Sequence, residues 1–223
     1  MASISFSLDT AKKALLNEGF VDLRDLKVGQ HIWEFEQKGF PFFTKDGLDF
    51  LQQRVLGNPD IRSIVEWFFE DKRCILAHCL RWGASPGHIE SFLAGGEDAG
   101  RRALMVQLLA KGSRVDYYAC SHLKALPTEK GPRSTHELSP DALREEGCEV
   151  RDGNFSAGGL VIVDARLGRE IKAGYSITVT FMTEDLATGL PKMALPNLVA
   201  LREKVAEMES QKIGVNFTFR SVS

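Results

Sequence analysis

The stretch Gly158–Asp185, GGLVIVDARLGREIKAGYSITVTFMTED, decides the fold of this chain. Its first part, Leu160–Val163, is a short apolar run behind two glycines, which is typical of a buried strand. Its second part, Ser176–Phe181, alternates polar and apolar residues with the period of two that marks a strand. The segment between them contains Arg169 and Glu170 and is expected to be the turn of a hairpin. We therefore predict two core strands of a β-sandwich.

The composition is that of an ordinary globular protein and excludes several classes of partner. The chain has 223 residues, 43% of them hydrophobic, which suits a single domain over residues 1–223. A net charge of -2 gives no electrostatic reason to expect nucleic acid or an anionic membrane. The N-terminus resembles no secretory leader and no apolar run is long enough to span a membrane, so we predict a cytoplasmic protein. The four cysteines lack metal-binding or redox spacing and are expected to be inert thiols.

Helical patterns occupy the N-terminal third and the C-terminal end. Capping residues and apolar periodicity predict helices over about 9–70 and a further helix over about 196–212. The first is expected to start at Asp9 or Thr10 and to end before Gly19, the second runs from Thr44 to Gly57, and the third from Pro59 to Glu70. We expect these helices to brace a sheet.

Short strand patterns fill the rest of the chain. They are predicted at Phe20–Leu26 as an outer strand, at Cys74–Leu80, Ala103–Leu109 and Val115–Ala119 in the core, and at Val215–Phe219 near the C-terminus. The polar segment Pro127–Gly147 contains three prolines and is expected to be an exposed excursion with one short helix after Ser139. It is a candidate lid or partner-contacting loop.

Three motifs, in this order, resemble one enzyme family. Leu15–Leu23, LLNEGFVDL, is similar to an opening in which a helix ends at a glycine and a strand begins. Val115–Leu123, VDYYACSHL, is similar to a proline-glycine-serine-histidine turn, with Ala119 and Cys120 in place of proline and glycine. Gly159–Leu167, GLVIVDARL, is similar to the strand that leads to the last metal histidine. Together they resemble the phytanoyl-CoA dioxygenase-like branch of the iron(II)/2-oxoglutarate oxygenases. The resemblance implies a mainly β fold with flanking helices: a double-stranded β-helix, or jelly roll, of cupin-like type.

The same resemblance implies a metal site that this chain does not complete. The family holds iron with a His-x-Asp pair and a distant histidine. His88-Ile89-Glu90 is the single His-x-acid sequence here, and these two residues are weak metal candidates whose alternative role is as polar loop residues. Where the distant histidine belongs, the chain has Arg169 and Glu170, and a protonated guanidinium has no lone pair to donate to iron.

The co-substrate anchor is also missing from the pattern. The family holds 2-oxoglutarate with an arginine about ten residues beyond that histidine, where this chain has Ala173–Ser176. Lys172 is the nearest cation, but it lies too early. We therefore expect no cofactor in this chain.

Four residues are candidates for a pocket: Asp116, Tyr117, His122 and Arg169. His122 is expected to be structural or pocket-lining, because the matching family position is not a metal ligand. The five histidines, His31, His78, His88, His122 and His136, show no i, i+4 pair that would indicate another metal site. No nucleophile elbow, P-loop or dinucleotide fingerprint is present.

Three functions are compatible with these observations. The first is a catalytically silent subunit that pairs with a homologous active oxygenase, similar to the accessory subunits of heterodimeric fungal meroterpenoid oxygenases, with iron and 2-oxoglutarate in the partner. The second is a cofactor-free isomerase or cyclase that acts on a small hydrophobic metabolite. The third is an active oxygenase with an altered metal site at His88 and Glu90. For the first, the aromatic cluster Phe40, Phe42 and Phe43 is a candidate interface, unless these rings pack under an N-terminal helix.

Overall fold

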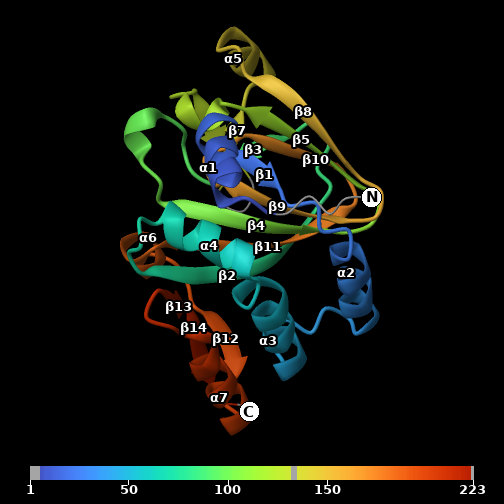
Figure 1. The fold of residues 1–223 in the computed structure, drawn as a ribbon, viewed down its shortest axis with the longest axis vertical. Helices are drawn as coiled ribbons and strands as arrows, with labels where there is room; N and C mark the ends of the chain where they lie inside the picture. The colour runs from blue at the N-terminus through green and yellow to red at the C-terminus, as the bar shows by residue number, and fades with distance from the viewer. Residues whose placement is uncertain (1–5, 132–134, 222–223) are drawn as a thin grey trace.

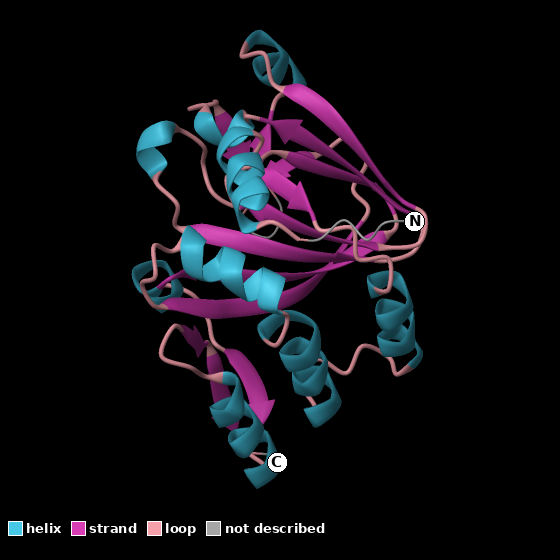
Figure 2. Ribbon diagram, viewed as in Figure 1, coloured by secondary structure: helices cyan, strands magenta, loops and turns pink. Residues whose placement is uncertain are grey.

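Two antiparallel sheets face each other in this computed structural model, which describes residues 6–131 and 135–221 (Figures 1 and 2). The first has the strand order β1-β9-β4-β11-β2, with β13 added in parallel at the edge, and the second has the order β6-β7-β3-β10-β5-β8. The predicted fold class, a mainly β double-stranded β-helix with flanking helices, is confirmed. Strands of the first sheet are β1 Phe20–Asp22, β2 Cys74–Gly83, β4 Ala103–Leu109, β9 Gly159–Asp164, β11 Tyr175–Thr183 and β13 Ile213–Val215. Strands of the second are β3 Ile89–Ser91, β5 Ser113–Ala119, β6 Thr128–Lys130, β7 His136–Leu138, β8 Glu149–Phe155 and β10 Arg169–Ala173.

The N-terminal helices cover the outer face of the first sheet, where α4 lies along β4 and β2 in Figure 1. Their apolar sides share one buried cluster with outward-facing residues of that sheet, such as Leu104, Val106 and Val179. The helices are α1 Leu8–Asn17, α2 Val28–Gln37, α3 Lys45–Leu51 with the π-helical turn η1 Gln52–Leu56, α4 Pro59–Phe68, α5 Pro140–Glu145, α6 Glu184–Thr188 and α7 Val199–Met208. Short 3-10 turns are η2 Glu97–Ala99 and η3 Ser121–Leu123.

The stretch Gly158–Asp185 is not the hairpin that the sequence predicts. Its first and last strands, β9 and β11, belong to the first sheet, where β4 separates them. The residues expected to form the turn make a third strand, β10, in the second sheet. The chain therefore crosses between the sheets after Asp164 and returns after Ala173. The predicted turn is wrong because Arg169 and Glu170 are buried and pair with β5 as part of a strand.

Other differences concern elements with weak local signals. Helix α2 was not predicted, and its Gly29 permits backbone contact: a Cβ there would lie 2.1 Å from Ala157 O. Strand β1 ends at Asp22 instead of Leu26. The C-terminal helix begins at Val199, because Pro196 ends a strand that pairs in parallel near the C-terminus. That small sheet consists of β12 Met193–Pro196 and β14 Phe217–Arg220, so the predicted strand at 215–219 is divided between β13 and β14.

A second apolar cluster fills the space between the two sheets. Met105 and Val163 from the first sheet meet Val115, Tyr117 and Ile171 from the second. Polar side chains are buried in the same layer, which is unusual for a core unless they are hydrogen-bonded. In the part of the chain that is described, no helix combines the length and the apolar character needed to cross a membrane.

Candidate functional site

Strand pairing brings Arg169 together with residues that lie far from it in sequence. Arg169 is the first residue of β10, and its Cα partners are Tyr117 on β5 and Glu90 on β3. Directly paired residues on neighbouring strands point to the same face of a sheet. The side chains of Glu90, Arg169 and Tyr117 therefore form a row across three strands. The fold therefore brings Glu90 of the His88-Ile89-Glu90 sequence next to Arg169.

The guanidinium of Arg169 is buried between the sheets. Arg169 is only 3% exposed. Its guanidinium lies over the ring of Trp82 on the facing sheet, 5.3 Å from the ring centroid. Nη1 finds no hydrogen-bond partner within residues 6–131 and 135–221. Burial lowers the pKa of Arg169, while the nearby Tyr117 and Glu90 raise it. Arginine starts so far above neutrality that the group remains a cation.

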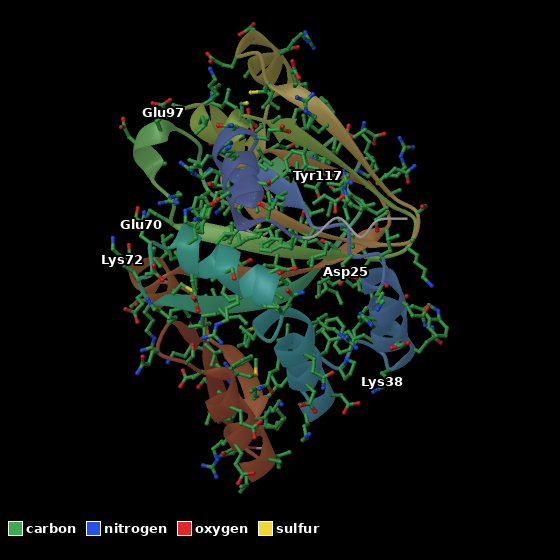
Figure 3. The ribbon with its side chains drawn as sticks, viewed as in Figure 1. Asp25, Lys38, Glu70, Lys72, Glu97 and Tyr117 are labelled. Atoms are coloured by element: carbon green, nitrogen blue, oxygen red, sulfur yellow. The ribbon has the colours of Figure 1, made fainter. Side chains whose placement is uncertain are left out.

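Tyr117 and Gln107 connect the two sheets beside this cation. In Figure 3, Tyr117 lies in the layer between the sheets. Its hydroxyl donates to Gln107 Oε1 at 2.9 Å, and its ring stacks on Phe20 with centroids 4.6 Å apart. Desolvation raises the pKa of Tyr117, so the phenol stays protonated. The Nε2 of Gln107 lacks a partner in the described chain.

Glu90 and His88 are held by different partners. Glu90 is 8% exposed and accepts a hydrogen bond from Thr135 Oγ1 at 3.1 Å. His88 is half-exposed, and its Nδ1 lies 2.8 Å from Oε1 of Glu137 on the neighbouring strand β7. The pairing of His88 with Glu137 competes with any joint ligation of a metal by His88 and Glu90.

These residues do not fit an iron ion with 2-oxoglutarate. His88, Glu90, Arg169 and Trp82 line a common cavity of about 10 Å³, which is roughly the space of one water molecule. A divalent cation there would face the guanidinium charge in a poorly solvated interior. Within the described residues, no three His, Cys, Asp or Glu side chains come together in a metal-binding group.

Asp116 lies on the opposite face of β5 from Tyr117, since successive strand residues alternate. It forms an ion pair with Lys172. Lys172, the cation nearest to the expected co-substrate anchor, is therefore already paired. The hydrogen bond of Lys172 to Asp116 raises the lysine pKa. Glu170 is on this face as well and accepts from the backbone N–H of Gly87 at 2.8 Å. The predicted pocket set is therefore split between two faces.

His122 is a packing residue in a third place. Cys120, two residues before it, has φ 66°, a left-handed conformation that glycine adopts most readily and that the resemblance places at a glycine position. His122 is 1% exposed, and its Nε2 lies 3.2 Å from the Leu16 carbonyl oxygen. Burial lowers the pKa of its imidazole. Gly19 must lack a side chain here, because a Cβ would approach His122 Nδ1 to 2.6 Å.

The aromatic cluster near α2 is partly buried and partly exposed. Phe40 and Phe42 pack on Phe35 of α2, with ring centroids 6.0 and 5.2 Å apart. Phe43 and Trp33 are each 49% exposed. Trp33 also lines a groove of about 590 Å³ between α2 and α3, to which both helices contribute charged side chains.

Trp82 and Gln107 were missed as site residues. Gln107 is the one polar residue in the apolar run Ala103–Leu109, and this signal was available. Trp82 lies beyond Leu80, where the predicted strand stopped, and only the longer β2 carries it to Arg169.

Comparisons with known proteins identify the fold and no close relative. A scan against models of protein families finds no match, and a search among curated proteins finds none either. The epimerase SnoN in complex with Fe3+, alpha ketoglutarate and nogalamycin RO has a TM-score of 0.56 at 14% identity, covering 82% of this chain and 90% of its own. HygX from Streptomyces hygroscopicus with iron bound has a TM-score of 0.52 at 10% identity, covering 81% and 88%. EctD from S. alaskensis with 2-oxoglutarate and 5-hydroxyectoine has a TM-score of 0.52 at 9% identity, covering 83% and 79%.

Proposed function

We propose that this chain is a catalytically silent, oxygenase-like subunit that pairs with an active iron(II)/2-oxoglutarate dioxygenase and supports it in terpenoid or meroterpenoid biosynthesis. One observation carries the proposal. Arg169, at the position that the resemblance assigns to the third metal ligand, is a buried cation with a residual cavity of about 10 Å³ beside it. The two-sheet fold is complete, but the place where iron would bind is filled by Arg169.

The similar folds supply the class of partner. SnoN is described with Fe3+, alpha ketoglutarate and nogalamycin RO, and HygX with iron. A chain that keeps this fold but lacks their kind of site has a shape suited to association with such an enzyme, because related subunits commonly pair through equivalent surfaces. Iron and 2-oxoglutarate would then be bound by the partner alone.

The partner surface that we propose is the rim of the groove between α2 and α3. Trp33 lines this groove, Phe43 directly precedes the Thr44 cap of α3, and each exposes about half of its surface. Aromatic residues are enriched in interface cores. Phe40 and Phe42 would support this rim from beneath, since both contact Phe35. Phe43 and Trp33 are therefore better probes of association than Phe42, whose replacement would also disturb the packing.

Co-expression with an oxygenase encoded beside this chain tests the pairing. The expected result is a complex of the two chains that survives size-exclusion chromatography, with turnover that falls when this chain is omitted. Trp33→Ser together with Phe43→Ser should weaken the complex at least about tenfold, as the loss of interface aromatics does.

The matched control is Val150→Ser on β8 of the second sheet. Val150 has the same fractional exposure as Trp33 and Phe43 but lies outside the proposed partner surface. It should leave association unchanged. Product formation by this chain alone in the presence of a chelator would refute the silent role and favour a cofactor-free isomerase. A stable monomer in the presence of the oxygenase would refute the pairing.

A further inference from the structure

We propose that Arg169 is a resident cation that takes the place of a metal ion between the two sheets: it compensates the buried Glu90 carboxylate and closes the interior to iron and 2-oxoglutarate. This goes beyond the proposed pairing, because it concerns the isolated chain and holds with or without a partner.

The first support is position. Glu90 and Arg169 are Cα partners on adjacent strands, and both side chains line the same small cavity. They are 8% and 3% exposed, so neither charge is screened well by water. Thr135 provides Glu90 with a neutral hydrogen bond, which does not balance its charge.

The second support is the incomplete hydrogen bonding of the guanidinium. An arginine buried for fold stability alone is expected to use its donors, since an unsatisfied buried donor is destabilising. Arg169 leaves Nη1 without a partner in the part of the chain that is described, and it lies over the ring of Trp82. Its contribution is therefore best explained by its charge and by the space that it fills.

The third support is the cost of burying the Glu90 carboxylate in this layer. An isolated buried carboxylate is strongly unfavourable unless a cation or several hydrogen bonds stabilise it. In a metal-binding protein the ion provides that charge, and the apo form is weakened without it. A covalently attached cation removes the dependence on metal.

A double-mutant cycle on the purified chain tests the compensation. Arg169→Met and Glu90→Gln should each shift the denaturant unfolding equilibrium toward the unfolded state. The unfolding equilibrium constant of the double variant should be at least about tenfold smaller than the sum of the two separate free-energy shifts predicts. The reason is that the double variant removes both charges. Additive shifts would overturn the proposal.

Glu137→Gln provides the matched control for the cycle. Glu137 is the Cα partner of Glu90 on β7, but its side chain is 35% exposed. Its combination with Arg169→Met should be additive. If Arg169→Met does not fold, Glu90→Gln carries the test by itself: it must destabilise the chain, and a neutral or stabilising effect would overturn the compensation.

Metal addition tests the closure on the unmodified chain. Its melting temperature should be the same in chelator as in Co(II) or anaerobic Fe(II) with 2-oxoglutarate. A metal bound at 100 times its Kd would raise the melting temperature by roughly 5–10 °C for a chain of this size. Such a rise, abolished by Glu90→Gln, would show an open metal site and overturn the proposal.

Discussion

Two buried arginines, three residues apart, are treated differently by this fold. Arg166 is 5% exposed and uses its whole fork: Nε and Nη2 contact the two carboxylate oxygens of Asp164 at 2.9 and 2.8 Å, and Nη1 donates to Gly96 O at 2.9 Å. Arg169 is 3% exposed, leaves Nη1 without a partner among the described residues, and rests on Trp82. The first has the geometry of a structural ion pair, which fixes the crossing between the sheets.

The difference teaches how to distinguish a structural charge from a substituted site. Buried arginines that support a fold have directional partners, and the chain around them is arranged to supply those partners. Arg169 has instead a carboxylate on the neighbouring strand, an aromatic face and a very small cavity, which is the arrangement of a charge held by burial and not by directional partners. Four measurements address this comparison.

The largest effect is expected at the structural pair. Arg166→Met leaves the Asp164 carboxylate, which is 2% exposed, without its bidentate partner. We expect a loss of about 3–5 kcal/mol in the free energy of unfolding, measured by urea denaturation. The control is Arg62→Met in the exposed pair with Glu66, which should change stability by less than about 1 kcal/mol. Equal effects of the two substitutions would refute the structural role.

Replacement of the second arginine should be less harmful. Arg169→Met removes a guanidinium with fewer directional bonds and replaces it with an apolar chain that fits the layer beside Trp82. We expect a loss of about 2 kcal/mol in the same urea experiment. A loss larger than that of Arg166→Met would mean that the contrast between the two arginines is false.

The bridge next to Arg169 should have a smaller effect. Tyr117→Phe keeps the ring on Phe20 but removes the hydroxyl that donates to Gln107 Oε1. We expect about 1.5 kcal/mol of destabilisation, because a buried acceptor loses its donor. Tyr118→Phe, at the next residue on the other face, serves as the comparison. An unchanged midpoint for Tyr117→Phe would show that the bridge does not join the sheets.

The smallest effect is a pH dependence of stability that arises from His122, which lies near the Asp164–Arg166 pair. Burial is the largest cause of the lowered pKa of His122, and the Asp164 and Arg166 charges act on it in opposite directions. The unfolded chain, with a histidine pKa near 6.5, therefore binds this proton more readily than the folded chain does. The stabilisation is complete above pH 6.5 and is lost as the pH falls below it.

Urea midpoints measured from pH 7.5 to pH 5 check this. We expect the unfolding free energy of His122→Gln to fall less between pH 7.5 and pH 5 than that of the unmodified chain. His78, whose pKa is also lowered by burial, should provide part of the remaining slope. An unchanged slope in His122→Gln would contradict the assignment.

Patterns within a few residues were predictable from the sequence. Ala103–Leu109 was predicted with its observed bounds because it is an apolar run with one polar residue, Gln107. Thr44 and Ser139 were placed correctly at helix starts because their hydroxyls accept from nearby backbone N–H groups. Helix α2 was missed since Gly29, in its first turn, disfavours a helix locally and is explained only by its contact with Ala157 and Gly158.

The candidate site shows the same division. The residue types alone exclude a histidine at the distal corner, and no arrangement of the fold gives Arg169 a lone pair for iron. What the sequence could not reveal is that Arg169 begins a buried strand, that Glu90 and Tyr117 are its direct neighbours, and that Asp116 and His122 lie elsewhere. Residue chemistry is local to one side chain, whereas the register that places 90, 117 and 169 in one row arises from pairing strands that are tens of residues apart.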